Sequence, residues 1–201
     1  DPARSSGAAR GGANPRVAAG LGVIPRVVGE GRSIQTGKIT MAEAEERLRH
    51  AYLPYHKALD TLLKAQRTRF GLALLFDCHS MPHDALAAAP LVRGRRPDVI
   101  LGDRFGASCG HWLVDAAMSA FKAEGFVVAR NAPFAGGYIT QNYGRPARGI
   151  HALQIEIDRS LYMDERSVTR ADGFDDVAFR LERVVTSLAA LSDQAPSLAA
   201  E

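Results

Sequence analysis

The four residues Asp77-Cys78-His79-Ser80 have types and spacing that suit metal-assisted chemistry, and they directly follow an apolar run over residues 70–76. Side chains alternate along a strand, so Asp77 and His79 are predicted to project to the same side. A carboxylate beside an imidazole can fix its tautomer, as acids do for metal-bound histidines. The pattern therefore predicts His79 as a zinc ligand with Asp77 as its partner. The alternative is a histidine hydrogen-bonded at the edge of a sheet.

The thiol in the same cluster is a poor candidate for a nucleophile. On a strand Cys78 points away from Asp77 and His79, so it cannot form the hydrogen bond that a nucleophile and its base require. We predict instead that Cys78 and Cys109 are small buried residues. Two cysteines are too few for a disulfide framework, which is typical of a protein in the reducing cytoplasm.

A second cluster is Gln154-Ile155-Glu156-Ile157-Asp158. On a strand the two isoleucines face one way and Glu156 faces the other. A carboxylate on an interior strand is costly unless it is paired or functional, which makes Glu156 a candidate general base acting on a metal-bound water. The alternative is an amphipathic strand with a solvated polar face.

A third cluster is rich in glycine and runs from Gly136 through Pro146. Paired glycines permit positive φ and a close backbone approach to a ligand, so Gly137 and Thr140 are candidate substrate-binding residues. Arg145 lies between a glycine and a proline and could bind a substrate carboxylate with two parallel hydrogen bonds. The alternative is an ordinary β-hairpin with a surface arginine.

The elements around these clusters alternate between helix and strand. Thr40 and Glu43 have the spacing of a capping box, which predicts a helix start, and Pro54 is expected to kink or split that helix. The run over 70–76 is typical of a strand buried on both faces of a central parallel sheet. Together they predict an α/β fold with a mixed, mostly parallel sheet flanked by helices. Further predicted elements are strands at 98–101, 126–129 and 151–158, helices at 108–124 and 174–191, and a long loop or hairpin at 130–149.

The 201 residues, of which 46% are hydrophobic, suffice for one compact domain. We expect a flexible arm or loop over 1–22, an α/β domain over 23–192 and a tail over 193–201. Five arginines against two acids in residues 1–37 account for the whole net charge of +3, which argues against a chain-wide basic face.

We therefore expect no partnership with nucleic acid. The arginines of the arm leave a nucleic-acid binder as an alternative, but the arm has no aromatic residue on which bases could stack. The longest apolar run is far too short to span a membrane, and no secretory signal pattern opens the chain. These features predict a cytoplasmic protein without a membrane partner, and they carry no signal for an oligomeric state.

Six short segments resemble, in order, the N-formylglutamate amidohydrolase family, and the resemblance covers roughly residues 21–165. The segments are Tyr52-Leu53-Pro54-Tyr55-His56, Asp77-Cys78-His79-Ser80, Leu101-Gly102-Asp103, Asn131-Ala132-Pro133-Phe134 with Gly136-Gly137-Tyr138-Ile139-Thr140, Gln154-Ile155-Glu156-Ile157, and Ser160-Leu161-Tyr162-Met163.

The resemblance implies a zinc-dependent amidohydrolase with a fold like the zinc carboxypeptidases and aspartoacylases, a phosphorylase/hydrolase-like architecture. Such enzymes hydrolyse N-formyl-L-glutamate, a small acidic substrate, to formate and L-glutamate in bacterial histidine breakdown. His79 matches a zinc ligand of the family and Asp77 its partner. Glu156 matches the glutamate that activates water, and Arg145 is similar to a residue for the substrate carboxylate.

The family also carries an earlier segment similar to His-Ser-Gly, which supplies further zinc ligands ahead of an Asn-Arg pair. Asp1-Pro2 resembles the residues that follow this pair, and these 201 residues contain no such segment. A catalytic zinc needs about three protein ligands, so His79 alone does not hold one. We expect either the later part of a longer chain, or a metal-free relative that binds a ligand or a partner protein.

Overall fold

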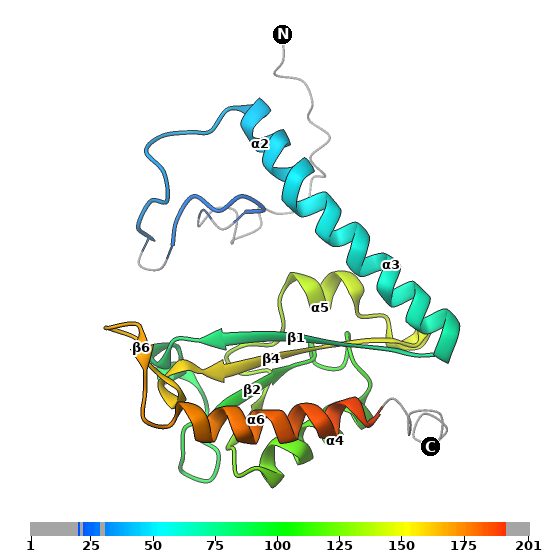
Figure 1. Ribbon diagram of the computed structural model, residues 1–201, viewed down its shortest axis with the longest axis vertical. Coiled ribbons are helices and arrows are strands. Elements are labelled where there is room, and N and C mark those ends of the chain that lie inside the picture. The colour runs from blue at the N-terminus through cyan, green and yellow to red at the C-terminus, as the bar shows by residue number, and fades with distance from the viewer. Residues whose placement is uncertain (1–19, 21, 29–30, 192–201) are drawn as a thin grey trace. The chain divides into compact units, whose positions relative to one another are not determined.

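The computed structural model describes residues 20, 22–28 and 31–191, and its chain divides into two compact units, Asp1–Lys57 and Ala58–Glu201 (Figure 1). The tail predicted over 193–201 and most of the arm predicted over 1–22 lie outside the described residues. The predicted domain limits stay predictions. None of the described helices is long and apolar enough to cross a membrane.

A helix distorted near Pro54 dominates the described part of the first unit. It begins as α2 (Met41–Arg47), where Thr40 Oγ1 accepts a hydrogen bond from the N–H of Glu43 at 3.2 Å, as the capping pattern predicts. The helix widens into a π-helical segment over Leu48–Tyr52 directly before the proline. Proline has no N–H to donate and crowds the preceding turn, so the helix is distorted here, but it continues without a break into α3 (Leu53–Phe70).

The second unit contains a four-stranded sheet in the order β1-β4-β2-β3. The pairs β1–β4 and β2–β3 are parallel, and the pair β2–β4 is antiparallel. This confirms the predicted α/β class with a mixed, mostly parallel sheet. The helices and strands from Leu53 onward are α3 (Leu53–Phe70), β1 (Ala73–Met81), β2 (Val99–Gly102), α4 (His111–Ala123), β3 (Val128–Arg130), α5 (Tyr138–Tyr143), β4 (Ile150–Asp158), β5 (Met163–Asp164), β6 (Thr169–Arg170) and α6 (Phe174–Ala189).

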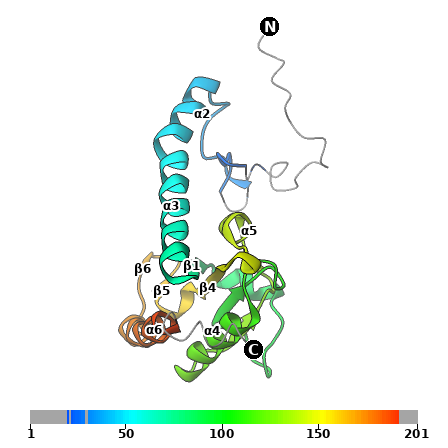
Figure 2. The same ribbon diagram turned by 90° about the vertical axis from the view of Figure 1, so that its right-hand side faces the viewer.

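Different helices cover the two faces of this sheet, as Figures 1 and 2 show. On one face α4 and α6 pack against Ile155 and its apolar neighbours. On the other face Tyr143 of α5 packs against Ala73 of β1. Because Ala73, Asp77 and His79 alternate with the residues between them, all three belong to the face that α5 covers. We call this the site face.

Strand β1 differs from the prediction in its limits and in its place in the sheet. It begins at Ala73 and continues through Met81, so Asp77 and His79 lie within the strand rather than beyond its end. Among the described residues β1 is an edge strand with several half-buried positions, not a strand buried on both faces. An apolar run shows that a strand packs well, but it does not show whether the strand has one neighbour or two.

The position of β1 at the edge of the sheet determines how exposed its cysteine is. Cys78 is exposed, so the predicted burial of this thiol is wrong, whereas the predicted burial of Cys109 is confirmed. The difference follows from the elements that carry the two residues. Cys109 precedes α4 and belongs to the main apolar core, while Cys78 lies on the outer strand.

The segment predicted as a long loop or hairpin is a loop followed by the short helix α5. Its helical residues lie between an N-cap at Gly137 and a C-cap at Gly144. Glycines at both ends of this segment are typical of turns, so the sequence pattern did not indicate the helix between them. Tertiary packing decides the outcome, because Ile139 and Tyr143 join an apolar cluster with residues of β1 and β4.

Candidate active site

Strand pairing brings the first two sequence clusters together on the site face. His79 Nε2 lies 3.0 Å from Asp77 Oδ1, which confirms that the two side chains share a side. The parallel register of β1 and β4 then places His79 opposite Glu156 and Asp77 opposite Gln154. An imidazole with a carboxylate partner therefore lies beside a second carboxylate from a strand about 80 residues further along the chain.

The second carboxylate is buried. Glu156 is 9% exposed, and its neighbours Gln154 and Asp158 on the same side of β4 are buried too, so the solvated polar face considered from the sequence is wrong. Burial raises the pKa of Glu156, and the nearby His79 with the hydrogen bond from Gln154 offsets this only in part. A carboxylate with a raised pKa is a stronger proton acceptor once ionised.

Gln154 links Glu156 to the glycine-rich segment. Its Oε1 accepts a hydrogen bond from the N–H of Gly137 at 2.6 Å, and its Nε2 donates to Glu156 Oε1 at 2.8 Å. Because Oε1 must face the backbone donor, Nε2 is directed at the carboxylate. Thr140 Oγ1 donates to the carbonyl oxygen of Gly137 at 2.9 Å. Gly137 and Thr140 are therefore connected to Glu156, while their predicted contact with substrate stays a prediction.

Two glycines allow the loop before α5 to lie directly on the sheet. A Cβ at Gly102 of β2 would lie 2.7 Å from the backbone nitrogen of Gly136, so no side chain fits there. Gly136 itself has a φ of +116°, and a Cβ on it would lie 2.6 Å from Thr140 Oγ1. The close backbone approach seen here is to strand β2, and it holds the N–H of Gly137 against Gln154.

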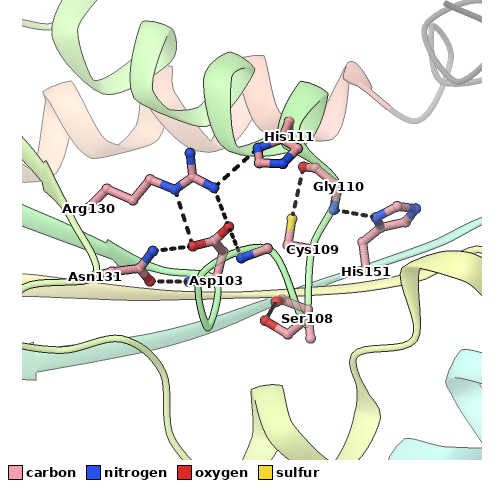
Figure 3. A network of polar contacts seen from close by, with 10 residues as sticks. Asp103, Ser108, Cys109, Gly110, His111, Arg130, Asn131 and His151 are labelled. Atoms are coloured by element: carbon pink, nitrogen blue, oxygen red, sulfur yellow. Dashed lines mark hydrogen bonds and ion pairs between the residues drawn. The ribbon is translucent and has the colours of Figure 1, made fainter.

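A buried ion pair anchors this loop (Figure 3). Asp103, which is 0% exposed, follows β2 and accepts hydrogen bonds from Arg130 Nε at 3.2 Å and Nη2 at 2.6 Å. Asn131 Nδ2 donates to Asp103 Oδ1 at 2.5 Å, and the N–H of Gly106 donates to Oδ2 at 3.0 Å. The Asn131 side-chain oxygen in turn accepts from the N–H of Asp103 at 3.0 Å. Both carboxylate oxygens are thus fully engaged.

The Asp103 network holds the loop at two points. Asn131 donates its N–H to Leu101 O at 2.9 Å, and Arg104 donates its N–H to Ala135 O at 2.7 Å. Burial alone would raise the pKa of Asp103, but the hydrogen bonds and charge of Arg130, with those of Asn131 and Gly106, outweigh it and lower the pKa. Sequence reasoning missed this pair. Two signals pointed to it: Asp103 and Asn131 stand in segments that carry the resemblance, and a charged residue directly follows the apolar strand at 99–102.

The histidines beside this network are structural. His151 Nδ1 accepts from the N–H of Gly110 at 3.0 Å (Figure 3). The His151 ring packs edge-on against Trp112. Burial lowers the pKa of His151, which agrees with a neutral ring that accepts at Nδ1. His111 Nδ1 accepts from Arg130 Nη2 at 3.3 Å. Burial raises the pKa of the Cys109 thiol to about 12, so this cysteine is unreactive.

A serine, a histidine and an aspartate also meet at the end of β4. His83 Nδ1 lies 2.8 Å from Asp158 Oδ2, and Ser160 Oγ lies 3.1 Å from the same nitrogen. A nucleophilic triad would need the serine and the acid on opposite ring nitrogens, so this cluster lacks that geometry. Ser160 donates through both its N–H and its hydroxyl to Asp158, which caps the turn after β4.

Arg145 lies apart from the other predicted site residues. Its Nη1 donates to the carbonyl oxygens of Gln141 at 3.0 Å and Gly144 at 2.5 Å. Its backbone pairs with Ile150, the first residue of β4, which lies about 20 Å along the strand from Glu156. The structure therefore does not bring Arg145 to Glu156. Its contact with a substrate carboxylate stays a prediction.

Replacing Gln154 by leucine is expected to destabilise the second unit by about 2 kcal/mol, because a buried N–H and a buried carboxylate each lose a partner. Hydrogen exchange of the Gly137 amide should accelerate as well. Urea unfolding and amide exchange measure the two effects. Gln141→Leu on the exposed side of α5 is the matched control and should stay within about 0.5 kcal/mol. Equal behaviour of the two variants would refute the linking role of Gln154.

Comparison with known proteins shows the family of the chain. The family described as N-formylglutamate amidohydrolase matches residues 2–163, a range that holds His79, Glu156 and the Asp103 network. The chain belongs to the N-formylglutamate amidohydrolase family. The matched range ends at residue 163, shortly after β4, so α6 lies outside it.

Relatives of this amidohydrolase family member include two proteins named N-formylglutamate deformylase. The one from Pseudomonas aeruginosa is 36% identical over 156 residues, which is 73% of this chain and 55% of the relative. The one from Pseudomonas putida is 37% identical over 151 residues, which is 72% of this chain and 54% of the relative. The chain thus spans about half the length of these relatives.

A solved structure shows the same fold. The N-formylglutamate amidohydrolase from Ralstonia eutropha JMP134 is 33% identical and superposes with a TM-score of 0.78. The match covers 90% of this chain and 64% of that one. The sheet and the helices that position Glu156 are therefore those of an amidohydrolase of this family.

The described residues do not by themselves fit the zinc that the resemblance implies. Within the part of the chain that the structure describes, no group of three or more His, Cys, Asp or Glu side chains could hold a metal ion. A catalytic zinc takes about three protein ligands. His79 would be one of them, and its Nε2 already faces Asp77.

Proposed function

We propose that this chain carries the water-activating residues of a site that hydrolyses the amide bond of an N-formyl amino acid. The substrate that we propose is N-formyl-L-glutamate, which yields formate and L-glutamate. The observation that supports the proposal is the buried Glu156, held by Gln154 and lying opposite His79 with its partner Asp77. The names of the two deformylases support the choice of substrate.

In the proposed reaction Glu156 acts as the general base. The ionised carboxylate accepts a proton from a water molecule whose oxygen bonds to the formyl carbon. Glu156 then passes the proton to the amide nitrogen as the C–N bond breaks, so that formate and the amine leave. Gln154 keeps the carboxylate in place, and Asp77 orients the ring of His79 by accepting its N–H.

Zinc belongs to the proposal as the cofactor of a complete site, with His79 as one ligand. When bound, zinc would polarise the formyl oxygen and acidify the water. The described residues supply too few ligands, so the steps above are derived without it. A cytoplasmic location and a place in bacterial histidine breakdown likewise stay predictions of the resemblance.

Metal analysis of the purified chain tests the ligand count. After loading with zinc and dialysis, we expect well below one zinc per chain by inductively coupled plasma mass spectrometry, because a single histidine binds zinc weakly. His79→Asn should leave that low content unchanged. One zinc per chain, lost in His79→Asn, would contradict this expectation and would reveal ligands outside the described residues.

The activity itself is tested by incubating the chain with N-formyl-L-glutamate and zinc and measuring released formate. Release that depends on Glu156 supports the proposal. Saturable binding of the substrate without release would favour the alternative of a metal-free relative that binds an acidic ligand. If the chain neither binds nor hydrolyses the substrate, the proposed function is wrong for this chain.

A further inference from the structure

A cavity of about 350 Å³ lies at the β3 edge of the sheet. Its lining includes Arg93, Arg95, Lys122, Phe126 and Val128. Phe126 and Val128 also belong to the apolar core under α4 and α6, so the cavity is on that side of the sheet rather than on the site face. Two strand spacings, about 10 Å, separate β3 from the strand that carries Glu156.

The charge around this cavity is one-sided. Three of its lining side chains are cationic, and no carboxylate lines it. The acidic side chains of the adjoining segments are engaged elsewhere. Asp98 Oδ2 accepts the N–H of Val127 at 2.7 Å, and the carboxylate of Glu124 accepts from Arg183 Nε at 2.8 and 2.9 Å.

The three cations themselves lack protein partners within residues 20, 22–28 and 31–191. No hydrogen bond or ion pair joins the side chain of Arg93, Arg95 or Lys122 to another residue of these ranges. Other cations on this unit form ion pairs with acids, as Arg180 does with Asp176 at 3.3 Å. Three uncompensated positive charges around one cavity create a local potential that favours an anion.

The backbone shapes the cavity on both sides. Val92 and Arg95 form an isolated antiparallel bridge with hydrogen bonds of 2.8 and 3.1 Å, so Arg95 closes a tight turn and Arg93 lies within it. Arg93 adopts a φ of +51°, a conformation that arginine rarely takes and that costs about 1 kcal/mol or more. The turn thus holds the backbone of Arg93 in a conformation that the residue itself disfavours.

Strand β3 adds a backbone donor. Val127 O accepts a hydrogen bond from the N–H of Val99, and the N–H of Asn131 donates to Leu101 O, so both groups face β2. Along a strand the backbone N–H and C=O groups of successive residues point to opposite sides. The N–H of Val128 therefore points away from β2, toward the open edge where the cavity lies. Guanidinium groups bind planar or tetrahedral oxyanions with paired N–H donors, and a lysine adds a point charge.

We propose that this cavity is a binding site for a small anion that bears phosphate groups. Three cations match a ligand with two or more negative charges, and the volume exceeds that of a single phosphate, so a diphosphate group fits best. The site is independent of the proposed hydrolysis, because it lies on the opposite face of the sheet. The ligand can bind without reaching Glu156.

Calorimetric titration with pyrophosphate at low salt tests the site directly. The whole chain is expected to bind with a sub-millimolar Kd. The variant R93Q/R95Q/K122Q should bind at least about 10-fold more weakly. The control R49Q/R69Q/R166Q removes the same charge from exposed positions that do not line the cavity, and its Kd should change by less than about 2-fold.

A conservative variant separates specific recognition from charge. Arg95→Lys keeps the charge but loses the paired donors, so its affinity should fall between those of the chain and the triple variant. Equal weakening in the two triple variants would overturn the proposal, and so would the absence of saturable binding at about 10 mM pyrophosphate. Much tighter binding of single-stranded RNA through the same three residues would overturn the assignment to a small anion.

Discussion

Glu156→Gln should abolish formate release from N-formyl-L-glutamate while leaving the fold intact. Glutamine has nearly the same shape, and its oxygen can still accept the hydrogen bond from Gln154 Nε2. It cannot accept a proton from water, and loss of a general base lowers kcat by about 10²- to 10⁴-fold. Steady-state kinetics with a coupled formate assay measures the loss.

The stability of this variant provides an internal check. Burial raises the pKa of Glu156, which means that the ionised side chain is disfavoured in the folded protein. A neutral glutamine removes that penalty, so urea unfolding at neutral pH should show unchanged or slightly higher stability. Glu182→Gln on the exposed side of α6 is the matched control. Retained activity in Glu156→Gln would rule out Glu156 as the base.

Asp103→Ala should destabilise the second unit by about 3 kcal/mol. Removing one partner of a buried ion pair costs about 3–5 kcal/mol because the other charge remains without compensation, and the 29% exposure of the Arg130 side chain favours the lower end. Asn131 and Gly106 lose their acceptor as well. Urea unfolding measures the change, with the exposed Asp172→Ala as the control.

The effect of Asp103 on stability depends on pH in a defined direction. Its pKa in the folded chain is lowered, whereas in the unfolded chain it is about 3.9. The ion pair therefore contributes fully at pH values above about 4 and is lost as the pH falls through the lower folded pKa. The stability difference between the chain and Asp103→Asn should shrink in that acidic range. A difference that stays constant with pH would mean that the charge of Asp103 does not stabilise the fold.

The Asp103 substitution also tests how the site is assembled. Asp103 accepts a hydrogen bond from Asn131 at the start of the loop. The same loop continues to Gly137, whose N–H donates to Gln154. Hydrogen exchange at Gly137 should therefore increase in Asp103→Ala even under conditions where the variant stays folded. Protection at Gly137 equal to that of the unmodified chain would show that the Asp103 network and the Gln154 link are energetically separate.

Local patterns in the sequence determined the class of the fold and the sides on which the polar residues lie. The period of two along 77–79 and 154–158 was enough to put Asp77 with His79 and to separate Glu156 from the isoleucines. The capping pattern at Thr40 and the position of Pro54 were enough to locate a helix start and a distortion of that helix. These features depend on backbone geometry over only a few residues, so they can be predicted from residue types and their spacing.

Tertiary structure alone decided which of these residues meet. The parallel register of β1 with β4 brings His79 to Glu156, and the loop lying on Gly102 brings Gly137 to Gln154. Tertiary structure also determines that Cys78 is exposed and that residues 138–143 form a helix. It places Arg145 beside the first residue of β4, far from Glu156. Contacts between distant segments depend on burial and hydrogen bonding summed over the whole domain, so no local spacing contains them.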